Sequence, residues 1–236
     1  MKLLLLLFKA LKFGKLLPAV GTMLLSVAAY AWMFGWQYAA GFVALLLVHE
    51  MGHYLAARRR GLDVGLPTFI PFVGAWVQLK ELPHDAETEA YVGIAGPLLG
   101  TVGALGCFYL SRSTGSTLLL ALAYAGFVIN LFNLIPLAPF DGGRVTAAIS
   151  PRLWLIGAPL LVALFFYHPS PLLILMAVLA LPNVMKAWHG MRSPEEEAYY
   201  SVRAETRLSY GTLYLGLAAF LAIMCEELHG ELPHTH

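Results

Sequence analysis

The chain has 236 residues, of which 59% are hydrophobic and only 12% are charged, and its net charge is +1. A soluble domain carries about 25% charged residues. This chain has too few to cover a globule in water, and a bilayer is the solvent that accepts such a composition. The near-zero charge gives no basis for nucleic acid as a partner. The two cysteines, Cys107 and Cys225, lie inside apolar runs and argue against a disulfide framework or a cysteine-based metal site.

The N-terminal segment combines leucines with lysines. A secretory signal peptide needs an apolar core of about 7–15 residues, and here Lys9, Lys12 and Lys15 interrupt the run. These lysines, with Lys2, fall on one arc of a helix. Residues 1–17 are therefore predicted to form an amphipathic helix in the lipid headgroup region.

Long apolar runs follow, and a helix needs about 20 such residues to cross a bilayer. We expect an all-α multi-pass membrane protein with six to seven transmembrane helices, forming a single domain over residues 1–236. A polar stretch, 193–208, is expected to be a surface helix capped by Ser193 with Pro194 at its first position. The expected spans are about 18–34, 38–57, 90–110, 117–139, 153–167, 171–188 and 208–225, the last three belonging to additional C-terminal spans over 150–226.

The basic residues orient the predicted spans. If the N-terminus is cytoplasmic, Arg112 is the one basic residue of the 15 in the chain that falls outside. Cytoplasmic loops are enriched in lysine and arginine, so we expect a cytoplasmic N-terminus.

The segment 61–89, after the second span, is neither a span nor a plain polar loop. Pro67, Pro71 and Gly74 exclude a helix there, and the neighbouring valine, threonine, phenylalanine, isoleucine and tryptophan residues favour strands. We expect a small β-rich element at the membrane edge, with a bend at Gly74.

The second span contains the sequence HExxH, as His49-Glu50-Met51-Gly52-His53. Residues four apart share a helix face, so His49 and His53 can bind one zinc ion, and Glu50 can reach a water on that ion. Ionisable groups inside a membrane are costly and usually mark function. The alternative is that the three residues are hydrogen-bonding contacts between helices.

A catalytic zinc needs a third protein ligand. Of the three aspartates, Asp63 and Asp85 lie in a polar-flanked loop, whereas Asp141 follows the fourth span at the cytoplasmic depth of the two histidines. Pro136 and Pro139 break that helix, which should leave Asp141 on an extended segment bent back towards the zinc. Asp141 could instead be a turn residue before Gly142-Gly143.

HEMGH together with NLIPLAPFDGG, at residues 133–143, resembles the site-2 protease family of intramembrane zinc metalloproteases. The resemblance covers about 36–145 and implies one zinc ion per chain held by His49, His53 and Asp141. It implies Glu50 as general base and Asn133 as a residue that positions substrate or stabilises the oxyanion. Gly93-Ile94-Ala95-Gly96-Pro97 and the β-rich segment resemble other parts of the family, whereas no segment resembles the PDZ or CBS domains that many members carry.

The resemblance implies hydrolysis of membrane-spanning protein substrates at an active site near the cytoplasmic side. Asn133 could instead be a helix-packing hydrogen bonder, and Asn130, on the same face, is assigned a packing role. We expect the apolar segment 68–79 to accept an unwound substrate as an added strand, although it could merely plug the cavity. The competing functions are a non-proteolytic membrane metal-binding protein or transporter, an inactive scaffold, and a protease whose third ligand is a glutamate.

Overall fold

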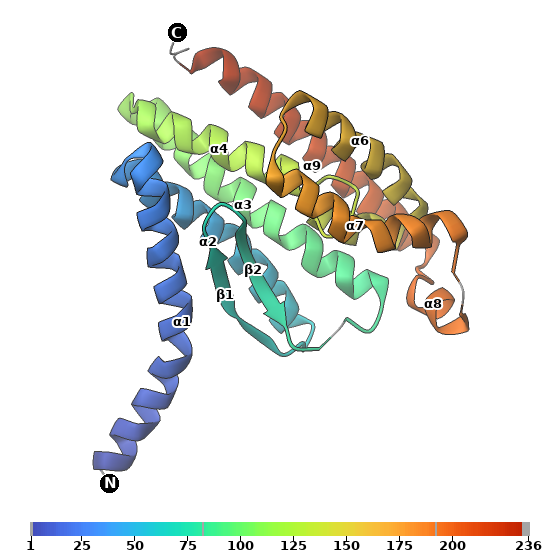
Figure 1. The fold of residues 1–236 in the computed structure, drawn as a ribbon, viewed down its shortest axis with the longest axis horizontal. Coiled ribbons are helices and arrows are strands. Elements are labelled where there is room, and N and C mark those ends of the chain that lie inside the picture. Colours follow the sequence, from blue (N-terminus) through green and yellow to red (C-terminus); the bar gives the residue numbers. More distant parts are fainter. Residues whose placement is uncertain (1, 82, 192, 233–236) are drawn as a thin grey trace.

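Helices dominate the fold (Figure 1), and the computed structural model describes residues 2–81, 83–191 and 193–232, with side chains from Leu16 onward. The predicted helical architecture with one small sheet is confirmed. The elements are α1 (Lys2–Phe34), α2 (Trp36–Arg59), β1 (Val64–Ile70), β2 (Gly74–Leu79), α3 (Ala86–Thr114), α4 (Thr117–Asn133), α5 (Asp141–Ile149), the 3-10 turn η1 (Pro151–Leu153), α6 (Trp154–Tyr167), α7 (Pro171–His189), α8 (Pro194–Tyr199) and α9 (Ala204–Glu231).

The chain is an integral membrane protein. Five helices of the described part are long and apolar enough to cross a bilayer, namely residues 16–34 of α1 and all of α2, α3, α7 and α9. Two further apolar helices, α4 and the stretch Pro151–Tyr167, are shorter than these. The count of six to seven spans therefore stays a prediction.

The N-terminal segment and the first span form one helix, because α1 continues without a break from Lys2 to Phe34 and includes Pro18, whereas the apolar span itself covers Leu16–Phe34. The lysine side chains at its start lie outside the described side chains, so the headgroup location of residues 1–17 stays a prediction. At the other end of the chain, Ser193 does cap a helix, with its hydroxyl accepting from the Glu196 N–H at 3.2 Å. That helix, α8, ends at Tyr199 rather than near residue 208.

Two predictions about the fourth span are wrong. The helix α4 ends at Asn133 and not near 139, because Pro136 and Pro139 cannot continue its hydrogen-bond ladder. Asp141 does not lie on an extended segment, since it is the first residue of α5. This helix can begin there because Gly142 and Gly143 pack on the backbone of residues 134–138, where any Cβ would overlap main-chain atoms.

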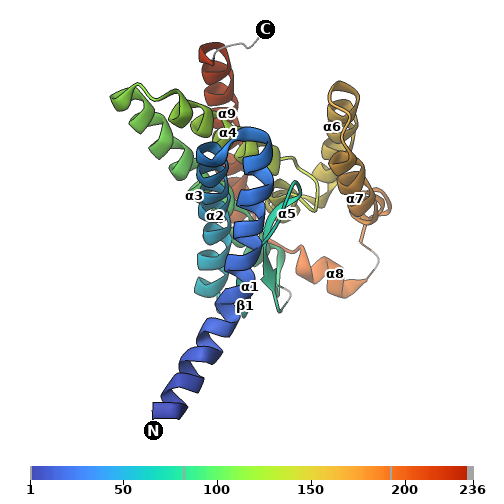
Figure 2. The ribbon, with the colours of Figure 1, turned by 60° about the vertical axis from the view of Figure 1, so that its left-hand side comes forward.

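The part of the fold that carries the predicted site is built around α3, which packs against α2, α4 and α5. Buried side chains of α3, α4, α5 and α9 form one apolar core, including Phe127, Val145 and Leu221. A second core joins α6 and α7 to the segment 135–140 and to α5. In Figure 2 the α6–α7 hairpin stands apart from the bundle of α2, α3, α4 and α9.

The predicted β-rich element is an antiparallel hairpin of β1 and β2, packed on α1 and α2. Its register pairs Thr68 with Trp76 and Phe69 with Ala75, and the strands are joined by a turn over residues 71–73. An ion pair between Lys80 Nζ and Asp63 Oδ2, at 2.9 Å, ties the open end of the hairpin. The prediction of short strands between the second and third spans is therefore confirmed.

Candidate metal centre

Two histidines of α2 converge on one point. His49 and His53 are one helical turn apart and are both buried, at 4% and 5% exposure. Their Nε2 atoms lie 3.1 Å apart. Each ring therefore directs the same nitrogen to the same place.

Asp141 completes this arrangement from α5. Its Oδ2 lies 3.1 Å from Nε2 of His49 and 3.2 Å from Nε2 of His53, so the three atoms form a nearly equilateral triangle. Four ligands at zinc bond lengths in a tetrahedral arrangement are separated by about 3.3 Å. The donor set and its spacing therefore fit one face of a zinc coordination sphere.

The contacts of the Nδ1 atoms show that Nε2 is the unprotonated nitrogen of each ring. Nδ1 of His49 lies 2.8 Å from Oδ1 of Asn130, and Nδ1 of His53 lies 2.8 Å from the carbonyl oxygen of Val92. Both partners are acceptors, so each Nδ1 carries the proton and donates it. Each Nε2 then presents a lone pair to the centre of the triangle, as a metal ligand must.

Glycines of α3 make room for these groups. A Cβ at Gly96 would overlap the imidazole of His53, and a Cβ at Gly100 would overlap the side-chain amide of Asn130. Gly93 faces the backbone of Asp141 and the Cβ of Arg144. The small-residue segment noted in the sequence therefore contacts the site itself.

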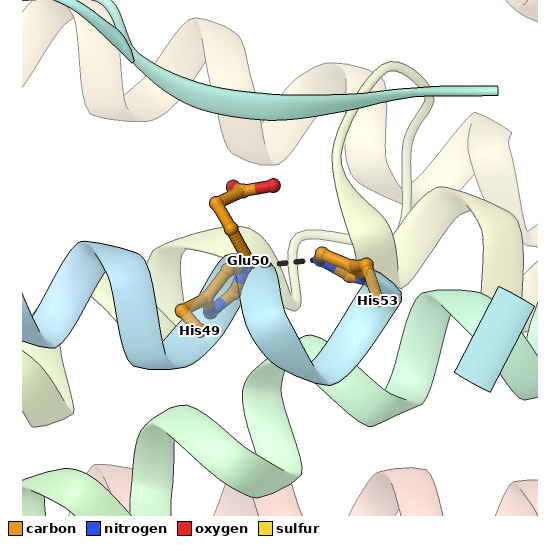
Figure 3. Close-up of side chains that lie close together, drawn as sticks. All are labelled: His49, Glu50 and His53. Atoms are coloured by element: carbon orange, nitrogen blue, oxygen red, sulfur yellow. Dashed lines mark hydrogen bonds between the residues drawn. The ribbon is translucent and has the colours of Figure 1, made fainter. Parts of the chain in front are cut away.

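Glu50 lies on another side of α2 from the rings. In Figure 3 its carboxylate rises towards the strand, whereas the two imidazoles turn towards each other. Its ligand atom and those of the two histidines all lie within 4.8 Å of one another. The carboxylate can therefore reach a water at the centre without displacing Asp141.

The two asparagines of α4 differ in role. Asn133 lines the cavity described below, and its Nδ2 donates to the carbonyl of Ile129 at 3.1 Å. One N–H of this amide is left for another acceptor, so its predicted role is possible but stays a prediction. Asn130, assigned only to packing, is 2% exposed and binds His49. The sequence signal was an asparagine three residues from Asn133 on the same helix face.

A cavity of about 530 Å³ opens onto the metal centre. Its lining includes β2, the hairpin turn and apolar side chains of α7. The lining includes His49, Glu50, His53, Asn133, Asp141 and Arg144. All the residues predicted to take part in catalysis therefore face one space.

The hairpin register decides which edge of β2 faces outward. The N–H of Phe69 donates to Thr22 Oγ1 at 3.3 Å, so it points away from β2, and its partner Ala75 occupies a non-hydrogen-bonded pair. Directions alternate along a strand, which turns the N–H groups of Ala75, Val77 and Leu79 outward. The Lys80 N–H donates across the hairpin to Asp63 O at 3.0 Å, which agrees with that alternation.

A chain of polar contacts connects Asp141 to the surface helix α8. Arg144 lies 3.9 Å from Asp141 Oδ1 and 3.7 Å from Glu89, and the Tyr199 hydroxyl donates to Glu89 at 2.6 Å. Burial raises the pKa of the Tyr199 hydroxyl, and the Glu89 carboxylate raises it further, so it stays a donor. Asp141 is therefore connected to α8 through Arg144, Glu89 and Tyr199.

The other two aspartates are used elsewhere. Asp85 caps α3, accepting from the Thr88 N–H at 2.6 Å, and Asp63 pairs with Lys80. The choice of Asp141 as the candidate third ligand agrees with this geometry.

Comparisons with known proteins point to one family. The model of peptidase family M50 matches residues 37–116. A zinc metalloprotease of Methanocaldococcus jannaschii is 32% identical over 113 residues, which are 46% of this chain and 32% of the relative. A putative zinc metalloprotease of Mycobacterium tuberculosis is 33% identical over 132 residues, or 51% of this chain and 33% of the relative. A probable chloroplastic zinc metalloprotease of Arabidopsis thaliana is 27% identical over 205 residues, or 67% and 37%.

The matches thus span about a third of the length of these curated relatives. The family model includes HEMGH and ends before Asp141. The assignment of Asp141 to the site therefore rests on the triangle of ligand atoms.

Proposed function

Because this chain belongs to peptidase family M50, the site-2 protease family, we propose that it is an intramembrane zinc metalloendopeptidase that hydrolyses peptide bonds of membrane-spanning proteins. The observation that carries the proposal is the buried triangle of His49, His53 and Asp141, with both histidines held as Nδ1–H tautomers. One zinc ion per chain would be held there.

Each residue around the triangle has its own role in the proposed hydrolysis. When bound, zinc supplies Lewis-acid chemistry that acidifies water and polarises a carbonyl. Glu50 accepts the proton of the attacking water and later donates it to the leaving amine. The free N–H of the Asn133 amide donates to the oxyanion as negative charge develops on the carbonyl. Arg144 lies 3.9 Å from Oδ1 of Asp141 and supplies a positive charge beside the ligand carboxylate.

The substrate enters as an added strand on β2. A peptide bond within a helix is shielded by its own hydrogen bonds, so the substrate must unwind before it is cut. The outward N–H and C=O groups of Ala75 and Val77 can pair with an unwound segment, and both residues line the cavity of the metal centre. Apolar side chains of α7 in the same cavity lining suit the side chains of a membrane-spanning segment.

The active site is proposed to lie near the cytoplasmic side. His49 and His53 stand about two turns before Arg58 and Arg59 at the end of α2, and these arginines favour the cytoplasmic face. The same reasoning places the N-terminus in the cytoplasm.

The proteolytic function is tested with Glu50→Gln, which keeps the ligands and removes the base. A tagged library of single-span proteins is co-expressed with either form. Wild type should release fragments, and Glu50→Gln should not while retaining its zinc. Equal cleavage by both forms would remove Glu50 from the reaction, and bound zinc without cleavage by either would favour a metal-binding protein or transporter.

The docking edge is tested with proline at Val77, because this removes an outward N–H and leaves the ladder to β1 intact. Cleavage should stop while zinc content stays normal, and Val77→Ala, which keeps the N–H, should remain active. Proline at Trp76 is unsuitable for this test, because the Trp76 N–H points at β1. Normal cleavage by Val77→Pro would make the hairpin a plug.

A further inference from the structure

Over residues 67–72, the part of β1 beyond its register shift together with the start of the turn, the N–H groups along the outer edge can be accounted for one by one. Thr68 and Ile70 alternate with Phe69 and so direct their N–H groups at β2. Pro67 and Pro71 have none. The two that remain on the outer side of residues 67–72 are those of Phe69, on β1, and Phe72, in the turn.

Both are bound by hydroxyl groups of α1. The Phe69 N–H donates to Thr22 Oγ1 at 3.3 Å, and the Phe72 N–H donates to the Tyr30 hydroxyl at 3.1 Å. Thr22 directs its own hydroxyl proton to the Ala19 carbonyl at 3.1 Å, which leaves a lone pair for the strand. The helix α1 therefore supplies acceptors where a neighbouring strand would otherwise pair.

Tyr30 also holds the turn in an uncommon conformation. Phe72 has a φ of 64°, which non-glycine residues rarely adopt. The ring of Tyr30 makes edge-on contacts with Phe72 and Phe42, with centroids 5.2 and 5.0 Å apart. All three aromatic residues line the cavity of the metal centre. The turn from which β2 begins is thus fixed to α1 and α2.

The two edges of the hairpin are therefore unequal. Within the described residues, the outward N–H groups of Ala75 and Val77 on β2 have no hydrogen-bond partner outside the hairpin. We propose that Thr22 and Tyr30 are positioning residues that close the β1 edge at its turn end and hold the hairpin, so that an unwound substrate has one edge to pair with there, beside the metal centre. An unprotected β1 edge would be a second template for strand pairing, on the side away from the cavity.

This inference rests on the proposed docking edge, and its first test is independent of activity. Amide hydrogen exchange is compared in wild type, Tyr30→Phe and Thr22→Val. The Phe72 amide in Tyr30→Phe and the Phe69 amide in Thr22→Val should exchange roughly two- to tenfold faster, the factor expected for one net hydrogen bond. Tyr38→Phe is the matched control, because Tyr38 stacks on Phe42 and its hydroxyl holds no strand amide. Unchanged exchange in both α1 variants would overturn the closure of the β1 edge.

The second test separates positioning from general destabilisation. In both variants KM for a single-span substrate should rise roughly two- to tenfold while kcat, zinc content and unfolding temperature stay near wild type. Thr22→Ser, which keeps the hydroxyl, should restore KM. Faster exchange with unchanged KM would overturn the positioning role, whereas full activity of Val77→Pro would instead overturn the docking edge. A wild type that cuts nothing would overturn the proposed protease function itself.

Discussion

Nδ1 of His49 donates a hydrogen bond to Oδ1 of Asn130 across 2.8 Å, and this contact joins the metal face of α2 to α4. Asn130 in turn donates its Nδ2 to the Gly126 carbonyl at 2.7 Å, which fixes the orientation of the amide. The backbone of α4 therefore holds Oδ1 of Asn130 in the orientation in which it can accept from His49.

Loss of this acceptor should weaken metal binding without removing a ligand. Asn130→Leu leaves the Nδ1–H of His49 unpartnered, and we expect zinc affinity to fall about 10- to 100-fold, as is typical when such partners are lost. Competition with a chelator of known affinity measures the change. Asn133→Leu, three residues along the same helix, should bind zinc normally and lose cleavage. Equal affinities in the two variants would contradict the different roles assigned to them.

The ligand set predicts a pattern of zinc content. His49→Ala, His53→Ala and Asp141→Ala should each lose the ion, because each removes one corner of the triangle, whereas Glu50→Gln should keep about one zinc per chain. Elemental analysis of purified protein measures this. Chelation of the wild type should abolish cleavage, and added zinc should restore it. A full complement of zinc in Asp141→Ala would exclude Asp141 from the site.

The close approach of α3 to the site predicts an effect from a single methyl group. In Gly96→Ala the new Cβ would overlap the His53 ring, so the ring must move and zinc binding should fall at least tenfold. Gly106→Ala on the same helix has open space around its Cβ and should bind zinc as the wild type does. The two variants are compared by chelator competition and by thermal unfolding. Normal zinc affinity in Gly96→Ala would show that α3 does not hold the His53 ring in place.

The orientation in the membrane is open to a direct measurement. Reporter fusions should place residues 58–89 and 142–151 on the cytoplasmic side, because the arginines flanking α2 and α5 favour that side. Arg112, paired with Glu231 at 2.5 Å, should lie on the opposite side. A reporter that places either segment outside would reverse the proposed location of the active site.

The sequence by itself determined the membrane environment, the candidate ligand pair on α2 and the presence of strands after the second span. These follow from local rules: apolar length, the four-residue spacing of His49 and His53, and the effect of prolines on helices. HEMGH and NLIPLAPFDGG also sufficed to identify Asp141 as the third candidate ligand, although not to predict that it begins a helix.

Only the tertiary structure decided how distant segments meet. Asn130 and the Val92 carbonyl bind the two imidazoles, and neither has a sequence spacing to His49 or His53 that could reveal the contact. The same holds for the hydroxyls of Thr22 and Tyr30 on the β1 edge and for the direction of the Val77 N–H, since the hairpin register decides both. Hydrogen bonds between segments 39 to 81 residues apart depend on how α1, α2, α3 and α4 pack, and packing is a property of the whole chain.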